Sequence, residues 1–373
     1  MNRFVFSLII ATTMIIASCE TAEKIIPSFE WSQLSAVPDK VGFAGSFAGI
    51  SNDHLIVAGG SQFPEGTRPW SGGVKTWNDK VLALNSDGKG WKEIGRLPRA
   101  VGYGISLNWK DGFLLIGGAN QTEHFREVYF IRYQNDQLFI DTLISLPHPL
   151  ANSCGAIINN IVYVAGGLSS PVALSAEHVF WALDLNRPRE QQQWKTLPSW
   201  PGEARMLGVA GQINGEFYLL SGTSLYIPEG DSLVHRRYLQ DGFVFNPDKG
   251  WRKIKELPHP VVAAPSPAYT NANQQLFIFG GDDGSRAEQN AVLKDQHPGF
   301  RTEIMMYDAP KDKWTIQGKV FTDQQPDPEN DPGASTWAPV TTPLVVWNQQ
   351  IIIPQGEARP GVRTNRVLAA HPE

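Results

Sequence analysis

A short apolar segment that ends in two small residues recurs along the chain. Paired glycines at its end let a strand turn sharply and approach its neighbours closely. One such pair is weak evidence, but several in step are the mark of a repeat architecture. The copies are Leu55–Gly60, Leu114–Gly118, Val162–Gly167, Phe217–Gly222, Leu276–Gly281 and, in degenerate form, Ile351–Gly356. This pattern predicts six repeats of one small sheet.

A second element, a tryptophan followed by Leu-Pro, accompanies most copies. We interpret the tryptophan as the mark of an outer strand, where its large face covers the space between adjacent repeats. The segments are Trp91–Pro98, Trp194–Pro198 and Trp251–Pro258, with Leu146-Pro147 lacking the tryptophan. Together the two elements resemble kelch repeats. They predict an all-β fold, a six-bladed kelch-type β-propeller.

The two ends of the chain predict how the propeller closes. After the last copy there is one more candidate strand, near Thr364 to Ala370, and no tryptophan-bearing outer strand. Phe29–Leu34 carries Trp31 and has no repeat of its own. We therefore expect this amino-terminal strand to complete the last blade, which removes edges that would otherwise template aggregation.

The first residues are typical of an export signal. Asn2 and Arg3 precede an uncharged run from Phe4 to Ile16, and Ala17-Ser18-Cys19 completes a lipobox. The run is shorter than the roughly 20 residues of a membrane-spanning helix. We predict a lipoprotein signal peptide at 1–18, a tether lipidated on Cys19 at 19–28 and one propeller at 29–373. An ordinary secretory signal is the alternative. The expected location is periplasmic or attached to the outer membrane, with membrane contact only through the lipid.

Composition and charge argue against several classes of partner and cofactor. The net charge is −5, with acidic and basic residues scattered, so nucleic acid is not an indicated partner. With Cys19 acylated, only Cys154 remains, and the protein has no disulfide to rely on. The eight histidines show no ligand spacing, which argues against a metal site and against a kelch-type copper oxidase. A homodimer is left open.

The segment that departs most from the repeat is Gln355–Thr364. We read Glu357 as standing where the repeat has its second glycine, and local rules tend to be broken at functional sites. Pro360-Gly361 is a strong turn signal that would fold Arg363 back toward Glu357. The bland alternative is a surface salt bridge in a hairpin.

Three long motifs make a narrower resemblance. They are Gly356–Thr364, Gly45–Asp53 (Gly-Ser-Phe-Ala-Gly-Ile-Ser-Asn-Asp) and Tyr103–Ser106 (Tyr-Gly-Ile-Ser). Together they resemble the bacterial N-acetylneuraminate epimerase family, the sialic acid mutarotases, which are six-bladed kelch propellers that interconvert the anomers of free sialic acid. In the common family order the Gly-Glu motif comes first, whereas here it comes last. The chain therefore resembles a circularly permuted branch.

The resemblance implies roles for two residues. Glu357 matches the proposed proton acceptor of the family and Arg363 its functionally important arginine, which would hold the carboxylate of a small sugar acid through a two-pronged contact. No metal, nucleotide or other cofactor is implied. A sialidase should show repeated Asp-box motifs, and the nearest segments, Ser86–Trp91 and Pro247–Trp251, have the wrong spacing. A non-catalytic kelch glycan-binding or scaffold lipoprotein is the alternative.

Further candidates for substrate contact lie in loops of the predicted propeller. Each arginine among them is more often a solvated loop residue than a ligand contact, and the tryptophan more often a core residue. They are Arg68, Arg205, Arg286 and Trp337. A long insert from Asp282 to Thr302 is either a lid over the axial pocket or a plain loop.

Overall fold

The computed structural model describes residues 29–323 and 335–372, which form six four-stranded antiparallel sheets. From the innermost strand outward, blade 1 is β2 (Phe47–Ser51), β3 (His54–Ala58), β6 (Lys80–Leu84) and β7 (Trp91–Arg96), blade 2 is β8 (Ile105–Trp109), β9 (Gly112–Ala119), β10 (His124–Gln134) and β11 (Gln137–Thr142), and blade 3 is β12 (Cys154–Ile158), β13 (Ile161–Ala165), β14 (Phe180–Asp184) and β15 (Trp194–Thr196). Blade 4 is β16 (Val209–Ile213), β17 (Glu216–Leu220), β20 (Gly242–Asn246) and β21 (Gly250–Ile254), blade 5 is β22 (Tyr269–Thr270), β23 (Gln275–Gly281), β24 (Arg301–Asp308) and β25 (Lys313–Lys319), and blade 6 is β26 (Val345–Trp347), β27 (Gln350–Arg359), β28 (Val362–Pro372) and β1 (Phe29–Leu34).

Smaller elements project from the blades. Two extra strand pairs are β4 (Ser61–Gln62) with β5 (Thr76–Trp77), and β18 (Thr223–Tyr226) with β19 (His235–Tyr238). The short helices are η1 (Pro64–Gly66), η2 (Pro69–Ser71), η3 (Arg189–Gln191), η4 (Ala287–Gln289), α1 (Asn290–Leu293), η5 (Lys294–Gln296) and η6 (Ala309–Lys311). Within the described residues, no helix has the length and apolar character needed to cross a membrane.

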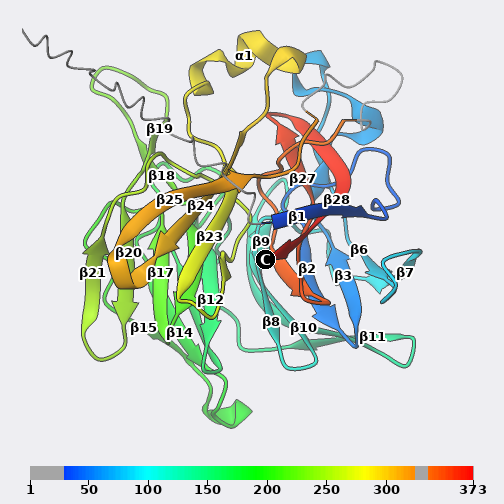
Figure 1. The fold of residues 1–373 in the computed structure, drawn as a ribbon, viewed down its shortest axis with the longest axis horizontal. Helices are drawn as coiled ribbons and strands as arrows, with labels where there is room; N and C mark the ends of the chain where they lie inside the picture. The colour runs from blue at the N-terminus through cyan, green and yellow to red at the C-terminus, as the bar shows by residue number, and fades with distance from the viewer. Residues whose placement is uncertain (1–28, 324–334, 373) are drawn as a thin grey trace, which may run out of the picture.

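The innermost strands stand side by side around one axis. β2 contacts both β26 and β8, β12 contacts β8 and β16, and β16 contacts β22. A bridge between Ser266 and Pro343 joins blade 5 to blade 6, so the circle is complete. The predicted six-bladed β-propeller is therefore confirmed (Figure 1).

The amino-terminal strand closes the last blade, as the sequence predicts. β1 pairs antiparallel with β28, in a register that runs from Phe29 opposite Pro372 to Leu34 opposite Val367. The buried Phe29 ring also packs edge-on against Phe277 of blade 5, 5.3 Å away between ring centroids. Both ends of the described chain are thus tied into one sheet, and no blade has a missing outer strand.

The hydrophobic core is divided among the six interfaces between blades. Each cluster of buried apolar side chains contains residues of two adjacent blades. The outer-strand tryptophans pack there. Four of them also donate their indole N–H to backbone carbonyls of the preceding blade or its connecting segment, whereas the buried Trp31 indole N–H has no partner among the described residues. These bonds are Trp91 to Ser35 (2.8 Å), Trp194 to Ile144 (3.1 Å), Trp251 to Pro198 (2.7 Å) and Trp314 to Lys255 (2.9 Å). The role predicted for the tryptophans is confirmed, and each of these four indole bonds also joins a blade to the one before it.

Candidate active site

A closed ring of backbone hydrogen bonds surrounds the propeller axis. In each blade, one residue shortly before the innermost strand donates its N–H to the carbonyl of the equivalent residue in the preceding blade, over 2.7–2.9 Å. All six residues have positive φ, between 50° and 65°, although five of them are not glycine. Such a conformation costs on the order of 1–3 kcal/mol per residue, and it clusters at functional sites. The ring residues are Gly45, Tyr103, Asn152, Leu207, Ala263 and Thr341.

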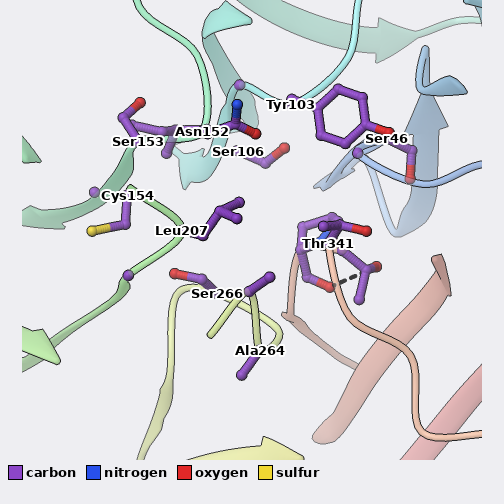
Figure 2. Close-up of a pocket in the computed structure, with 18 residues that line it drawn as sticks. Ser46, Tyr103, Ser106, Asn152, Ser153, Cys154, Leu207, Ala264, Ser266 and Thr341 are labelled. Carbon is purple, nitrogen blue, oxygen red and sulfur yellow. Dashed lines mark hydrogen bonds between the residues drawn. The ribbon is translucent and has the colours of Figure 1, made fainter. Parts of the chain in front are cut away.

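The ring lines a cavity on the axis. Figure 2 shows Tyr103, Asn152, Leu207 and Thr341 arranged around this cavity, with Cys154 at its wall. Burial raises the pKa of the Cys154 thiol to about 12, so this cysteine is not poised as a nucleophile. Tyr103 and Thr341 line the cavity, whereas Glu357 and Arg363 lie beside it and are not part of its lining.

Glu357 does not replace a glycine of the repeat, and this interpretation of the sequence is wrong. The blade 6 pair is Gln355-Gly356, whose φ angles of 49° and 130° match the left-handed conformation of the glycine pairs elsewhere. Gln355 takes the place of the first glycine, and its buried side chain accepts a hydrogen bond from the Phe43 N–H (3.1 Å). Glu357 stands one position later. There its backbone bridges to Val340, next to the ring residue Thr341.

The same bridge occurs in every blade, so the position of Glu357 has five counterparts. The bridged residue follows the small pair directly, and its partner directly precedes the ring residue. The residues at this position therefore lie next to the ring, at the same end of each blade. They are Ser61, Ala119, Leu168, Thr223, Asp282 and Glu357 in blades 1 to 6.

Glu357 and Arg363 face each other across the β27–β28 hairpin, as the turn at Pro360-Gly361 predicts. They are cross-strand partners, and Arg363 Nη1 donates to Glu357 Oε1 over 2.9 Å. The Gly361 N–H donates to the same oxygen over 2.8 Å. Among the described residues, Oε2 has no hydrogen-bond partner, and the Glu357 side chain is 20% exposed. One carboxylate oxygen is therefore fixed and the other is open to solvent.

Arg363 is enclosed by protein. Its side chain is 2% exposed, its Nε donates to the Ser61 carbonyl (3.4 Å), its Nη2 reaches Tyr103 Oη (3.5 Å), and it lies over the Phe63 ring. Burial by itself lowers the pKa of Arg363, but the charges and hydrogen bonds of Glu357 and Tyr103 together outweigh it and leave that pKa above the usual value. The guanidinium is committed to these partners. It is therefore placed to position Glu357, and the two-pronged contact with a substrate carboxylate does not fit this burial.

Tyr103 connects blade 2 to this pair, and the sequence interpretation gave it no role. Its hydroxyl shares a hydrogen bond with Ser61 Oγ (2.7 Å) and lies 3.5 Å from Lys75 Nζ. A Cβ added to Gly45 would stand only 2.7 Å from the Tyr103 ring, so glycine is required there. The motifs that contain Gly45, Tyr103 and Glu357 thus meet in consecutive blades 1, 2 and 6. Tyr103 opens one of these three motifs, and its place there was the sequence signal that could have singled it out.

Two long connections meet at the β27–β28 hairpin. One is the segment between β3 and β6 of blade 1, called here the blade 1 excursion, and the other is the insert from Asp282 to Thr302 in blade 5. Arg68 donates through Nε to Asp295 Oδ1 (2.8 Å), and Arg359 donates to the carbonyl of the same Asp295 (2.7 Å). Gly361 at the hairpin tip packs against Pro69, 2.9 Å from the position of an added Cβ. In Figure 1 the insert that carries α1 and the light-blue segment after β3 lie together at the top of the view. The insert therefore covers the end of the propeller that holds Glu357.

The remaining candidates lie outside the Glu357 cluster. Arg205 is 1% exposed and binds both oxygens of Asp241 (2.7 and 3.1 Å), so its surroundings are those of a structural ion pair and it does not fit a substrate contact. Arg286 is exposed and lines a polar cavity under the insert together with Pro360. Trp337 is buried beneath the Arg359 guanidinium, 4.8 Å from it, as a core aromatic would be. Neither lines the axial cavity.

The signal peptide, Cys19 and the tether lie outside the described residues. In residues 29–323 and 335–372, no group of three or more His, Cys, Asp or Glu side chains is arranged to hold a metal ion.

Known proteins are similar to this chain in sequence and in fold. A family model described as N-acetylneuraminate epimerase matches residues 16–140. The N-acetylneuraminate epimerase of Haemophilus influenzae (strain 86-028NP) is 28% identical over 60% of this chain and 57% of that protein. The Salmonella arizonae protein of the same name is 25% identical over 62% of this chain and 59% of that protein. The chain thus spans less than two thirds of the length of these curated relatives.

A solved structure titled "Structure of YjhT" has the same fold. It superposes with a TM-score of 0.62 at 14% identity and covers 78% of this chain and 88% of that one. The kelch-type propeller and the resemblance to the N-acetylneuraminate epimerases, both predicted from the sequence, are confirmed.

Proposed function

We propose that this protein is a mutarotase that interconverts the α and β anomers of free N-acetylneuraminate. The single observation that carries the proposal is the Glu357–Arg363 pair at the axial end of the propeller, with one fixed and one open carboxylate oxygen. The identity of the substrate in this proposal is taken from the names of the relatives. The pair supplies a base in a defined position.

The reaction needs one proton to move between two oxygens. Free sialic acid is a cyclic hemiketal, and ring opening removes the proton of the anomeric hydroxyl while the bond from the anomeric carbon to the ring oxygen breaks. In our proposal Glu357 Oε2 takes that proton and returns it to the ring oxygen, so that a ketone forms. Rotation then presents the other face of the carbonyl, and the same steps in reverse close the ring. General acid–base catalysis of this kind contributes about 10²–10⁴-fold.

Arg363 and Gly361 act through Glu357 in this scheme. Their bonds to Oε1 hold the carboxylate in one orientation, which leaves Oε2 directed at the substrate. Positioning of the base lowers the entropic cost of the proton transfer. Arg363 is thus a positioning residue.

The test is a proton NMR time course on freshly released α-N-acetylneuraminate. Wild type should speed anomer equilibration above buffer, and Glu357→Gln should lose about 10²–10⁴-fold of that acceleration. Asp282→Asn is the matched control, because Asp282 occupies the equivalent position in blade 5. A non-catalytic glycan-binding or scaffold protein is the alternative. It is favoured if folded wild type binds the sugar and leaves the rate at the buffer value.

We also propose that the chain is exported and anchored by lipid on Cys19, in the periplasm or at the outer membrane. The support is the lipobox Ile16-Ala17-Ser18-Cys19 after the uncharged run. Metabolic labelling with an alkyne fatty acid should mark wild type and not Cys19→Ser. Equal labelling of the two proteins contradicts the anchor.

The order of the motifs supports a permuted origin. In the common family order the Gly-Glu motif precedes the Phe-Ala-Gly-Ile-Ser-Asn-Asp motif, and here it follows. Because the propeller is closed, with β1 completing blade 6, moving the termini between blades leaves the contacts around Glu357 intact. We propose that this chain is a circularly permuted relative.

A further inference from the structure

Lys75 places a positive charge beside the Glu357–Arg363 pair, and the proposed proton transfer does not use this charge. Its Nζ lies 3.5 Å from Tyr103 Oη, 5.2 Å from the centroid of the Tyr103 ring and 5.4 Å from that of Trp77. No Asp or Glu among the described residues forms an ion pair with it, whereas the nearby Arg68 and Arg363 pair with Asp295 and Glu357. The ammonium group has three donors, and Tyr103 can satisfy one of them.

The fold holds Lys75 near Glu357 through short links. Lys75 precedes β5, whose Trp77 is the cross-strand partner of Ser61 in β4. Ser61 shares a hydrogen bond with Tyr103 and accepts one from Arg363 through its carbonyl. Lys75 and Arg363 therefore approach the same Tyr103 hydroxyl, each at 3.5 Å. Two cations flank this hydroxyl, and within the described part of the chain only Arg363 has a carboxylate partner.

Lys75 carries the positive charge near Glu357 that a bound anionic ligand would neutralise. Glu357 compensates Arg363, whose side chain is 2% exposed and has no open donor face for a substrate. Lys75 is half-buried, and its two aromatic neighbours hold the ammonium in place at little entropic cost. A carboxylate that binds it would gain a charge-assisted hydrogen bond in a partly desolvated position.

We propose that Lys75, and not Arg363, binds the carboxylate of the sugar acid. This inference rests on the proposed function for the identity of the ligand. It deepens that function by assigning specificity for an acid to the blade 1 excursion and proton transfer to the blade 6 hairpin. Neutral sugars of the same shape would lack the contact, so the charge of the substrate is what Lys75 selects.

Equilibrium binding tests the assignment without relying on turnover. N-acetylneuraminate and its methyl ester, which lacks the negative charge, are titrated by calorimetry into wild type, Lys75→Met and Lys75→Arg. Lys80→Met is the matched control, because Lys80 lies in the same blade and pairs with Glu93 (3.3 Å) on its outer strands. Thermal unfolding of each variant verifies that it is folded.

The acid should bind Lys75→Met about ten- to a hundredfold more weakly than wild type, the range for a hydrogen bond to a charged group. The ester should bind both equally, Lys75→Arg should retain most of the affinity, and Lys80→Met should behave as wild type. Unchanged affinity of folded Lys75→Met for the acid overturns the proposal. So does an equal loss for acid and ester, or the absence of acid binding to wild type.

The two proposals fail in different ways. If wild type binds the acid through Lys75 but leaves anomer exchange at the buffer rate, the mutarotase function is wrong and the assignment of Lys75 stands. If exchange is catalysed while Lys75→Met binds the acid as wild type does, the reverse holds.

Discussion

Blades 5 and 6 place a carboxylate at the same backbone position and surround it differently. Asp282 and Glu357 each follow the small pair of their blade and each bridge to the residue before the ring. Glu357 is paired with the buried Arg363. Asp282 has no ion pair among the described residues; it accepts hydrogen bonds from the Gly284 N–H (3.0 Å) and the Tyr238 hydroxyl (3.1 Å).

The difference shows how little the repeat itself determines. Burial raises the pKa of Asp282 above its usual value, because the two hydrogen bonds only partly offset the cost of desolvating its charge. Glu357 instead has a guanidinium within hydrogen-bond distance and an oxygen open to solvent. The repeat supplies the position, and the neighbouring side chains decide whether a carboxylate there serves structure or chemistry.

The largest effect is expected when the cation that pairs with Glu357 in blade 6 is removed. Arg363→Met should lower the rate of anomer exchange about 100-fold, because Glu357 loses the bond that orients it. It should also destabilise the protein by about 3 kcal/mol, the lower end for breaking a buried pair, since Glu357 retains some solvent contact. NMR exchange rates and urea unfolding measure the two effects.

The double variant Arg363→Met with Glu357→Gln separates these effects. Removing the second charge should restore a large part of the lost stability and none of the activity, because an unpaired buried charge is the main cost. If the double variant regains activity, Glu357 is not the base. If Arg363→Met alone is as stable as wild type, the pair does not act as described.

The sequence was sufficient for the fold because each blade repeats the same two signals. The glycine pairs predicted where strands turn near the axis, and the tryptophans predicted the outer strands. Even the closing strand followed from Trp31, which had no repeat of its own. These signals are local, and each depends on a few neighbouring residues.

The site was predictable only where its contacts are local. Glu357 and Arg363 lie on one hairpin, and the turn at Pro360-Gly361 was enough to bring them together. Tyr103 and Lys75 come from other blades, and no spacing in the chain indicates that they meet. The aligned glycine pair was misread because Gln355 adopts a left-handed conformation that glycine usually takes, held by its bond to the Phe43 N–H.

Asp282→Asn tests whether the carboxylate of blade 5 contributes to stability and not to catalysis. An Asp whose pKa is raised in the folded state contributes stability below its unfolded pKa, near 3.8, and loses it as pH rises through the folded value. The stability of wild type relative to the variant should therefore fall as the pH rises from 3.8 through the higher pKa of the folded state. Anomer exchange should stay within about twofold of wild type, as for a substitution away from the chemistry.

Thermal unfolding at several pH values measures this effect. Asp241→Asn is unsuitable as a control, because Asp241 holds the buried Arg205, whereas the exposed Asp87→Asn leaves no buried partner behind. A pH dependence of Asp282→Asn identical to that of wild type would show that Asp282 does not titrate over this range.

The smallest expected effect concerns the ring that both blades share. Ala263 is the ring residue of blade 5, with φ of 56°, and its neighbour Ala264 has no positive φ. Ala263→Gly should stabilise the protein by up to about 1 kcal/mol, because the relief of left-handed strain exceeds the entropy that glycine adds to the unfolded chain. Ala264→Gly should instead destabilise it by about 0.5–1 kcal/mol. Urea unfolding of the two variants compares them directly, and the same sign for both would mean that the ring conformation is not strained. Exchange activity should be unchanged in Ala263→Gly, since blade 5 supplies a ring residue and blade 6 supplies the base.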